Sequence, residues 1–235
     1  MSIFLDSSDV NEVDAIMKMG VIRGVTTNPT IMCKNGIEGG VEGIKKRIVE
    51  IANRVHPLPV SVEVLTNDKD EMIRQALEFK SWCDNVNVKI TIHGPSGQLH
   101  NLEVIHLLET RFDVRVNTTA TMNAQQCYLA AMAGSTYVSI FGGRINNMGH
   151  SSIDEIHRTR RLLDAQGLKA KIIVGSIREV LNVTDWLIAG AHIVTVTPEL
   201  LRKLIVHPYT KETVKMFLED ASRLLATTRC HDIKN

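Results

Sequence analysis

Lys89 lies in a segment whose alternation is typical of a buried strand. From residue 86 to 92, valine or isoleucine alternates with Asn87, Lys89 and Thr91. Side chains of a strand point alternately to its two faces, so an apolar face covered by helices leaves Lys89 on the interior face. Burying an ammonium group without a role is costly. We therefore predict a chemical role for this lysine, because burial favours a neutral amine that can attack a carbonyl.

Glu63 follows the same pattern in the segment 60–64, where valines alternate with Ser61 and Glu63. A carboxylate on a strand near Lys89 could move protons to and from a substrate hydroxyl, directly or through one water. Together the two residues suit imine formation followed by cleavage of a carbon–carbon bond, with the protonated imine as the electron sink. A purely structural Lys89–Glu63 ion pair is the alternative.

These side chains need a fold that brings strand ends together. Short β-branched runs alternate with helical periodicity eight times along the 235 residues. The predicted strands are 3–6, 24–28, 60–64, 86–91, 113–119, 137–141, 171–175 and 193–197. The predicted helices are 9–19, 38–55, 68–80, 97–111, 123–133, 152–166, 178–189 and 199–206, with a further amphipathic segment at about 210–226.

Eight uninterrupted strand–helix units predict a single α/β domain over residues 1–235, a (β/α)8 TIM barrel with an extra C-terminal helix. An open doubly wound sheet is the alternative. That fold usually carries a glycine-rich turn after its first strand, where this chain has Asp-Ser-Ser-Asp at 6–9. The barrel is therefore favoured.

Polar residues recur where the predicted strands end, the face on which barrel enzymes build their active sites. These residues are Asp6, Asn28, Asn117, Thr119, Ser139 and Ser176, while Arg115, Tyr137 and Phe141 share interior faces of their strands. Taken singly, an Asp or Asn at a strand end is more often a helix cap or turn residue. Arg144, Ser176 and Arg178 follow the sixth and seventh strands, where barrels often hold phosphate, and they indicate an anion site.

Composition argues against several other classes of function. Twenty-seven basic and 26 acidic residues are evenly spread, which does not suggest a nucleic-acid partner. The nine histidines and four cysteines show no metal-ligand spacing, so no metal or cofactor is expected. No long apolar run or signal peptide is recognised, and the expected location is cytoplasmic, with no membrane partner.

The combined motifs resemble the small transaldolases and fructose-6-phosphate aldolases over nearly the whole chain. The matching stretches are Phe4–Asp6, Gly24–Thr30, Val88–Ile90, Asn117–Thr119, Ala133–Gly134, Ser139–Arg144 and Gly175–Arg178. The resemblance implies that Lys89 forms the Schiff base, that Asp6 assists proton transfer, and that Glu63 is an acid/base acting through a water held with Thr119. It implies substrate-binding roles for Thr27, Asn28, Asn117, Ser139, Phe141, Arg144, Ser176 and Arg178.

Two positions distinguish the branches of the family. Its aldolases tend to carry Gln in place of Glu63 and Tyr in place of Phe141, so the resemblance favours transfer of dihydroxyacetone over its release. Thr91 and Ile140 replace the usual prolines near the substrate, which leaves phosphate and sulfonate open as the distal anion of the sugar substrate. A barrel that only binds ligands is a third reading. The resemblance also implies a homo-oligomer, a decamer or pentamer, with the terminal helix packed on a neighbour.

Overall fold

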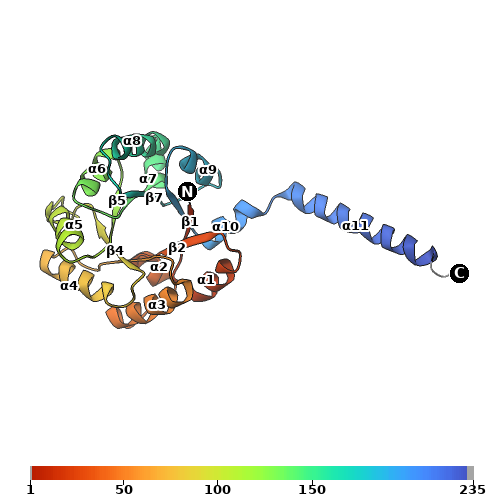
Figure 1. Cartoon of the computed structure of the whole chain (residues 1–235), viewed down its shortest axis with the longest axis horizontal. Helices are drawn as coiled ribbons and strands as arrows, with labels where there is room; N and C mark the ends of the chain where they lie inside the picture. Colours follow the sequence, from red (N-terminus) through yellow and green to blue (C-terminus); the bar gives the residue numbers. More distant parts are fainter. Residues whose placement is uncertain (1, 232–235) are drawn as a thin grey trace. The chain divides into compact units, whose positions relative to one another are not determined.

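A computed structural model describes residues 2–231, with side chains up to residue 226. The chain divides into two compact units, residues 1–198 and residues 199–235. In the first unit, eight parallel strands close into a barrel in sequence order, and helices surround it (Figure 1). The strands are β1 Ser2–Asp6, β2 Ile22–Thr26, β3 Val60–Glu63, β4 Val86–Thr91, β5 Val116–Thr121, β6 Tyr137–Ile140, β7 Lys171–Val174 and β8 Ile193–Val196.

The helices of this unit follow the strands in turn. They are α1 Val10–Met17, α2 Pro29–Lys34, α3 Gly40–Val55, α4 Lys69–Lys80, α5 His100–Arg111, α6 Ala124–Met132, α7 Gly142–Asn147, α8 Ser152–Ala165 and α9 Leu181–Ile188. Several begin at side-chain caps, for example Asp68 for α4 and Ser151 for α8, whose oxygens accept backbone N–H groups of the first turn. These caps fix the first residues of the helices that carry them.

Pairing of β1 with β8 closes the sheet and confirms the predicted barrel. The open doubly wound alternative is therefore wrong. Alternation of side chains also holds: outward residues such as Val88 and Ile90 are fully buried, as expected under a layer of helices. Phe4, Tyr137, Ile173 and Ile193 form a buried apolar cluster inside the barrel, which we call the floor.

Several predicted boundaries need correction. The second strand ends at Thr26, and Asn28 instead caps α2, a short helix that the periodicity did not reveal. Asp113 has a positive φ of 51°, so β5 begins only at Val116 and Arg115 lies exposed ahead of it. Phe141 caps α7, a second unpredicted helix. Short helices of six residues carry too little periodicity to be recognised in a sequence.

The second unit contains α10 Pro198–Ile205, apart from its first residue Pro198, and α11 Pro208–His231. The predicted terminal helix at about 210–226 is confirmed and is longer at both ends. Large apolar side chains along α11 are exposed, among them Phe217, Leu218 and Leu224. Within the described part of the chain, no helix is both long and apolar enough to cross a membrane.

Candidate active site

Lys89 lies near the middle of the barrel interior, on β4, with 5% of its surface exposed. Its Nζ lies 3.2 Å from Oε2 of Glu63, its register partner on β3, and donates a hydrogen bond of 2.9 Å to the carbonyl oxygen of Thr27. Both side chains of the pair are largely buried, at 7% and 18% exposure. A buried ion pair of this kind contributes little net stability, since desolvation of both charges offsets their attraction.

Asp6 ends β1 and faces the same cavity. Thr26 Oγ1 donates to its Oδ1 over 2.7 Å, and the Thr26 hydroxyl lies 2.6 Å from that of Thr195 on β8. Burial raises the pKa of Asp6, although Lys89 and the Thr26 hydrogen bond oppose the shift; the charge of Glu63 adds to it. A carboxyl with a raised pKa takes up a proton more readily, which suits a group that exchanges protons with a substrate.

A chain of hydrogen bonds orients the amide of Asn117 on β5. Ser139 Oγ donates to Asn117 Oδ1 over 2.6 Å, and Asn117 Nδ2 donates to Ser61 Oγ over 3.3 Å. Asn28 Oδ1 accepts the backbone N–H of Ile31 at 3.0 Å, so its amide nitrogen is left for the cavity. The Asn117 amide is therefore oriented by side chains of β3 and β6, and the Asn28 amide by the first turn of α2.

Thr119 brings a hydroxyl to the cavity whose Oγ1 is buried and has no partner among the described residues. Ala120, next in the chain, has a positive φ of 60°, and the pairing of β5 with β6 shifts register between Thr118 and Thr121. This irregularity interrupts the regular pairing beside the cavity, and bulges are common next to active sites.

Two arginines follow the later strands: Arg144 lies in α7 after β6, and Arg178 lies in the segment after β7. The guanidinium carbon of Arg144 lies 5.1 Å from the centre of the Phe141 ring, a cation–π contact. Neither Arg144 nor Arg178 pairs with a carboxylate anywhere in the described part of the chain. Ser176, in the loop after β7 and two residues before Arg178, lines the same cavity and has a positive φ of 61°. The group is suited to an anion.

All of these side chains meet in one cavity of about 500 Å³, which reaches from Lys89 and Asp6 to the arginines. Every site residue predicted from the sequence lines it except Thr27, whose hydroxyl donates to the Ser61 carbonyl while its own carbonyl binds Lys89. Sequence reasoning missed Thr26, Thr195 and Lys34, which also line the cavity. Thr195 could have been found, as the single polar residue in an otherwise apolar β8.

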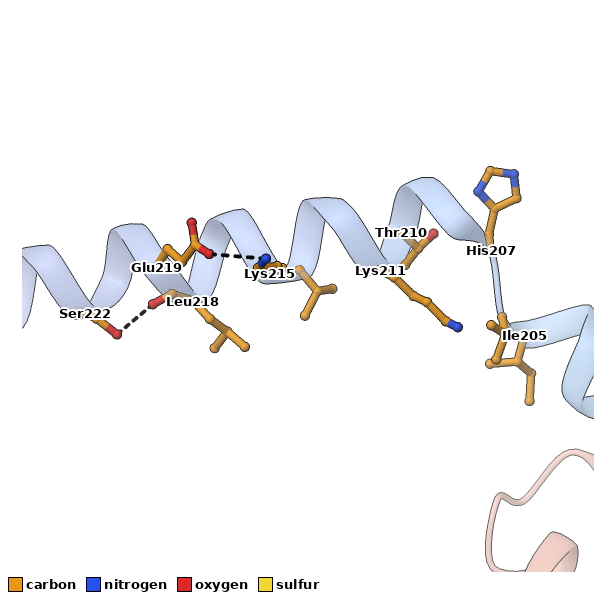
Figure 2. A pocket seen from close by; sticks show the side chains of 10 residues that line it. Ile205, His207, Thr210, Lys211, Lys215, Leu218, Glu219 and Ser222 are labelled. Atoms are coloured by element: carbon orange, nitrogen blue, oxygen red, sulfur yellow. Dashed lines mark hydrogen bonds and ion pairs between the residues drawn. The ribbon is translucent and has the colours of Figure 1, made fainter.

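Four other hollows in the described part of the chain are larger but lack this constellation. A cavity of about 910 Å³ near α7 and α8 shares Arg144 and Arg178 with the site but contains no lysine. A groove of about 590 Å³ runs along α11, where Lys215 already pairs with Glu219 at 3.9 Å (Figure 2). Among the side chains described, up to residue 226, no three His, Cys, Asp or Glu residues gather as metal ligands would.

Comparison with known proteins identifies the family of the chain. The profile of the family described as "Transaldolase/Fructose-6-phosphate aldolase" matches residues 3–235. "Probable transaldolase 1" of Bacillus cereus is 34% identical over 220 residues, covering 94% of this chain and 97% of that one. "Probable transaldolase 2" of Listeria monocytogenes is 37% identical over 220 residues, covering 94% and 95%.

A solved structure supports the fold alone. Thiamine phosphate pyrophosphorylase from Pyrococcus furiosus superposes with a TM-score of 0.59 at 10% identity, covering 87% of this chain and 95% of the other. Such low identity carries no information on activity. The sequence matches do carry it, over nearly the full length of each partner. The chain therefore belongs to the transaldolase/fructose-6-phosphate aldolase family of enzymes.

Proposed function

We propose that the protein is a transaldolase that moves a dihydroxyacetone unit from an anionic ketose to an acceptor aldehyde. The donor is fructose 6-phosphate or its 6-sulfonate analogue 6-deoxy-6-sulfofructose, and the acceptor is an aldehyde such as glyceraldehyde 3-phosphate or erythrose 4-phosphate. The observation that carries the proposal is the placement of Lys89, Glu63 and Asp6 around one cavity, with Lys89 and Glu63 3.2 Å apart.

The reaction begins when the Lys89 amine adds to the C2 carbonyl of the donor. Loss of water then gives a protonated imine, and Glu63, through a water held with Thr119, supplies and removes the protons of this step. Asp6 takes the proton of the C4 hydroxyl as the C3–C4 bond breaks, and the electron pair moves into the imine to give an enamine. The fragment from C4 onward leaves as an aldehyde, which vacates the site for the acceptor. The enamine then attacks the acceptor aldehyde, Asp6 returns the proton, and water releases the product.

The remaining residues hold the substrate. The amides of Asn28 and Asn117 bind the hydroxyls of the dihydroxyacetone end, and Ser139 fixes the Asn117 amide at 2.6 Å. Arg144, Ser176 and Arg178 bind the distal anion, since guanidinium groups without carboxylate partners favour phosphate or sulfonate oxygens. A side-by-side assay of fructose 6-phosphate and its 6-sulfonate analogue as donors identifies the anion: the true donor has the higher kcat/KM.

The central test is trapping of the imine. Incubation with donor and borohydride is expected to leave a stable adduct on Lys89, and Lys89→Met is expected to abolish both adduct and turnover. Lys171→Met is the matched control, because Lys171 is an exposed strand lysine. A folded Lys89→Met protein that still forms the adduct refutes the assignment. Absence of an adduct in the parent protein, with a panel of phosphorylated and sulfonated ketoses, would instead support a barrel that only binds ligands.

A fructose-6-phosphate aldolase is the second candidate, because it needs the same lysine. Glu63 and Phe141 both line the cavity and favour transfer by the family resemblance. With donor alone, a transaldolase accumulates the enamine form and releases dihydroxyacetone slowly. Free dihydroxyacetone at the full turnover rate, without an acceptor, would establish the aldolase.

We further propose that the protein acts in the cytoplasm as a homo-oligomer, pentamer or decamer, through α11. Figure 2 shows Ile205, Lys211 and Leu218 projecting to one side of this segment. Phe217 and Leu218 are 61% and 65% exposed. Leu218 in the groove and its sequence neighbour Phe217 thus leave large apolar side chains of α11 exposed, which is typical of an association surface. Light scattering of Phe217→Asp combined with Leu218→Asp is expected to give a smaller particle, and an unchanged mass would exclude α11 as the contact.

A further inference from the structure

Gly143, in the first turn of α7, lies against the loop that follows β7. A Cβ atom at this position would lie 1.7 Å from the carbonyl oxygen of Ser176 and 2.9 Å from its carbonyl carbon. Both are backbone atoms, which cannot rotate away as a flexible side chain does. No residue other than glycine therefore fits while α7 and the loop after β7 keep this approach.

The loop itself is held in an unusual conformation. Ser176 has a φ of 61°, in the left-handed region that residues with a side chain seldom adopt and that costs of order 1 kcal/mol or more. The carbonyl of this same residue is the group that lies against Gly143. The close contact and the strained backbone conformation therefore occur at the same residue, Ser176.

Both arginines of the anion site lie next to this contact. Arg144 is the next residue after Gly143, and Cγ of Arg178 would lie 3.1 Å from a Cβ at Gly143. The Phe141 ring, 5.1 Å from the Arg144 guanidinium carbon, limits where that guanidinium can go. The spacing between α7 and the loop after β7 thus sets the spacing of the two guanidinium groups.

The α7 side of the contact has little freedom to yield. A Cβ at the neighbouring Gly142 would lie 2.6 Å from the buried Trp186 ring and 2.9 Å from Val174. Trp186 is itself fixed, because its Nε1 donates to Ser152 Oγ over 2.8 Å. An added methyl group at Gly143 must therefore displace the Ser176 loop, and Arg178 with it.

We propose that Gly143 is a positioning residue for anion recognition: its lack of a side chain lets the Ser176 carbonyl approach, which sets Arg144 and Arg178 to bind one distal anion of the donor. The proposal rests on the proposed function and deepens it. Anion recognition then depends on the backbone contact between Gly143 and Ser176 as well as on the charges of the arginines.

The test compares an anionic donor with a neutral ketone in Gly143→Ala. The KM for fructose 6-phosphate is expected to rise about tenfold or more, the scale of one lost charge-assisted hydrogen bond. Trapping of dihydroxyacetone on Lys89 by borohydride is expected to stay unchanged, because this ketone has no distal anion. Gly149→Ala is the control, since a Cβ there meets no atom within 4 Å although its φ of 77° is also positive.

A double-variant cycle separates the contact from general damage. Ser176→Gly allows the loop more conformations, so adding it to Gly143→Ala is expected to lower the KM relative to Gly143→Ala alone, measured against Ser176→Gly as its own reference. If Gly143→Ala does not fold, recovery of both folding and KM in the double variant supports the proposal, and failure to recover overturns it.

Two further results overturn the inference. One is a folded Gly143→Ala protein with a KM within about twofold of the parent; the other is loss of dihydroxyacetone trapping in parallel with the rise in KM. Failure of the proposed function looks different, because the parent protein would then trap no ketone at all.

Discussion

The two ends of the barrel interior are built from the same strands and have opposite character. On β1, Phe4 belongs to the apolar floor and Asp6, two residues later on the same face, belongs to the site. On β6, Tyr137 and Ser139 repeat this arrangement. The Phe4 and Tyr137 rings meet edge to face with centroids 6.5 Å apart. On one face of a strand, an apolar residue of the floor and a polar residue of the site thus lie only about 7 Å apart along the strand.

The difference is one of free energy as well as of position. The floor removes apolar surface from water and stabilises the fold. The layer above it keeps Asp6, Glu63 and Lys89 in a mostly buried space, where desolvation raises the pKa of Asp6. Stability gained in the floor offsets the cost of the polar layer. Substitutions in the two layers should therefore change stability and activity in different ways.

The largest change in stability is expected for Phe4→Ala. The Phe4 side chain is 3% exposed, and its ring fills the space beside Gly24, where a Cβ would come within 2.6 Å of it. Its loss should lower the free energy of unfolding by about 3–5 kcal/mol, measured by urea denaturation. Phe112→Ala is the control, because that ring is 40% exposed. Imine trapping by the folded fraction should persist; a stability loss below about 1 kcal/mol would mean that the floor is not a structural core.

Glu63→Gln should have its main effect on activity. It removes the carboxylate that lies 3.2 Å from Lys89, and with it an acid/base group, so transfer should slow by about 100-fold or more. Glu103→Gln breaks an exposed pair with Lys69, at 2.5 Å, and should leave the rate unchanged. Coupled assays of both variants measure the effect. A rate in Glu63→Gln equal to the parent would reduce the Lys89–Glu63 pair to a structural one.

Much of this two-layer arrangement could be predicted from the sequence, because strand alternation is a strong constraint. Valine and isoleucine on every second residue of the segment 86–92 put Lys89 inside before any contact was known. Register then decided its partner: pairing of β3 with β4 sets Glu63 directly opposite Lys89. The sequence alone could suggest this pair but not its distance, which depends on how the barrel closes.

Residues in the loops could not be placed so well. Asn28 and Phe141 were expected to end strands but cap the short helices α2 and α7. Lys34 enters the cavity only because α2 exists. The tight contact of Gly143 with Ser176 has no periodic signal, since it depends on a positive φ at a residue that is not glycine. Tertiary packing fixes such positions, and local sequence preference does not reveal them.

A smaller change in stability is expected for Asp6→Asn, and it compares the two layers most directly. Because the pKa of Asp6 is raised in the folded state, folding favours its protonated form, and the folded protein loses stability as the pH rises above the ordinary value of 3.8 and through the raised folded-state pKa. Asparagine removes this cost, so the ligand-free variant should melt at a higher temperature than the parent at neutral pH. The advantage should shrink as the pH falls toward 3.8, where Asp6 is protonated in both states.

The same substitution should slow transfer, because asparagine cannot accept the C4 hydroxyl proton. Melting curves between pH 4 and 8, with the exposed Asp70→Asn as the control, test the stability part. A variant that is less stable than the parent at neutral pH would show that the attraction between Asp6 and Lys89 outweighs desolvation. The polar layer would then stabilise the barrel as the floor does, and the contrast between the two layers would be one of chemistry alone.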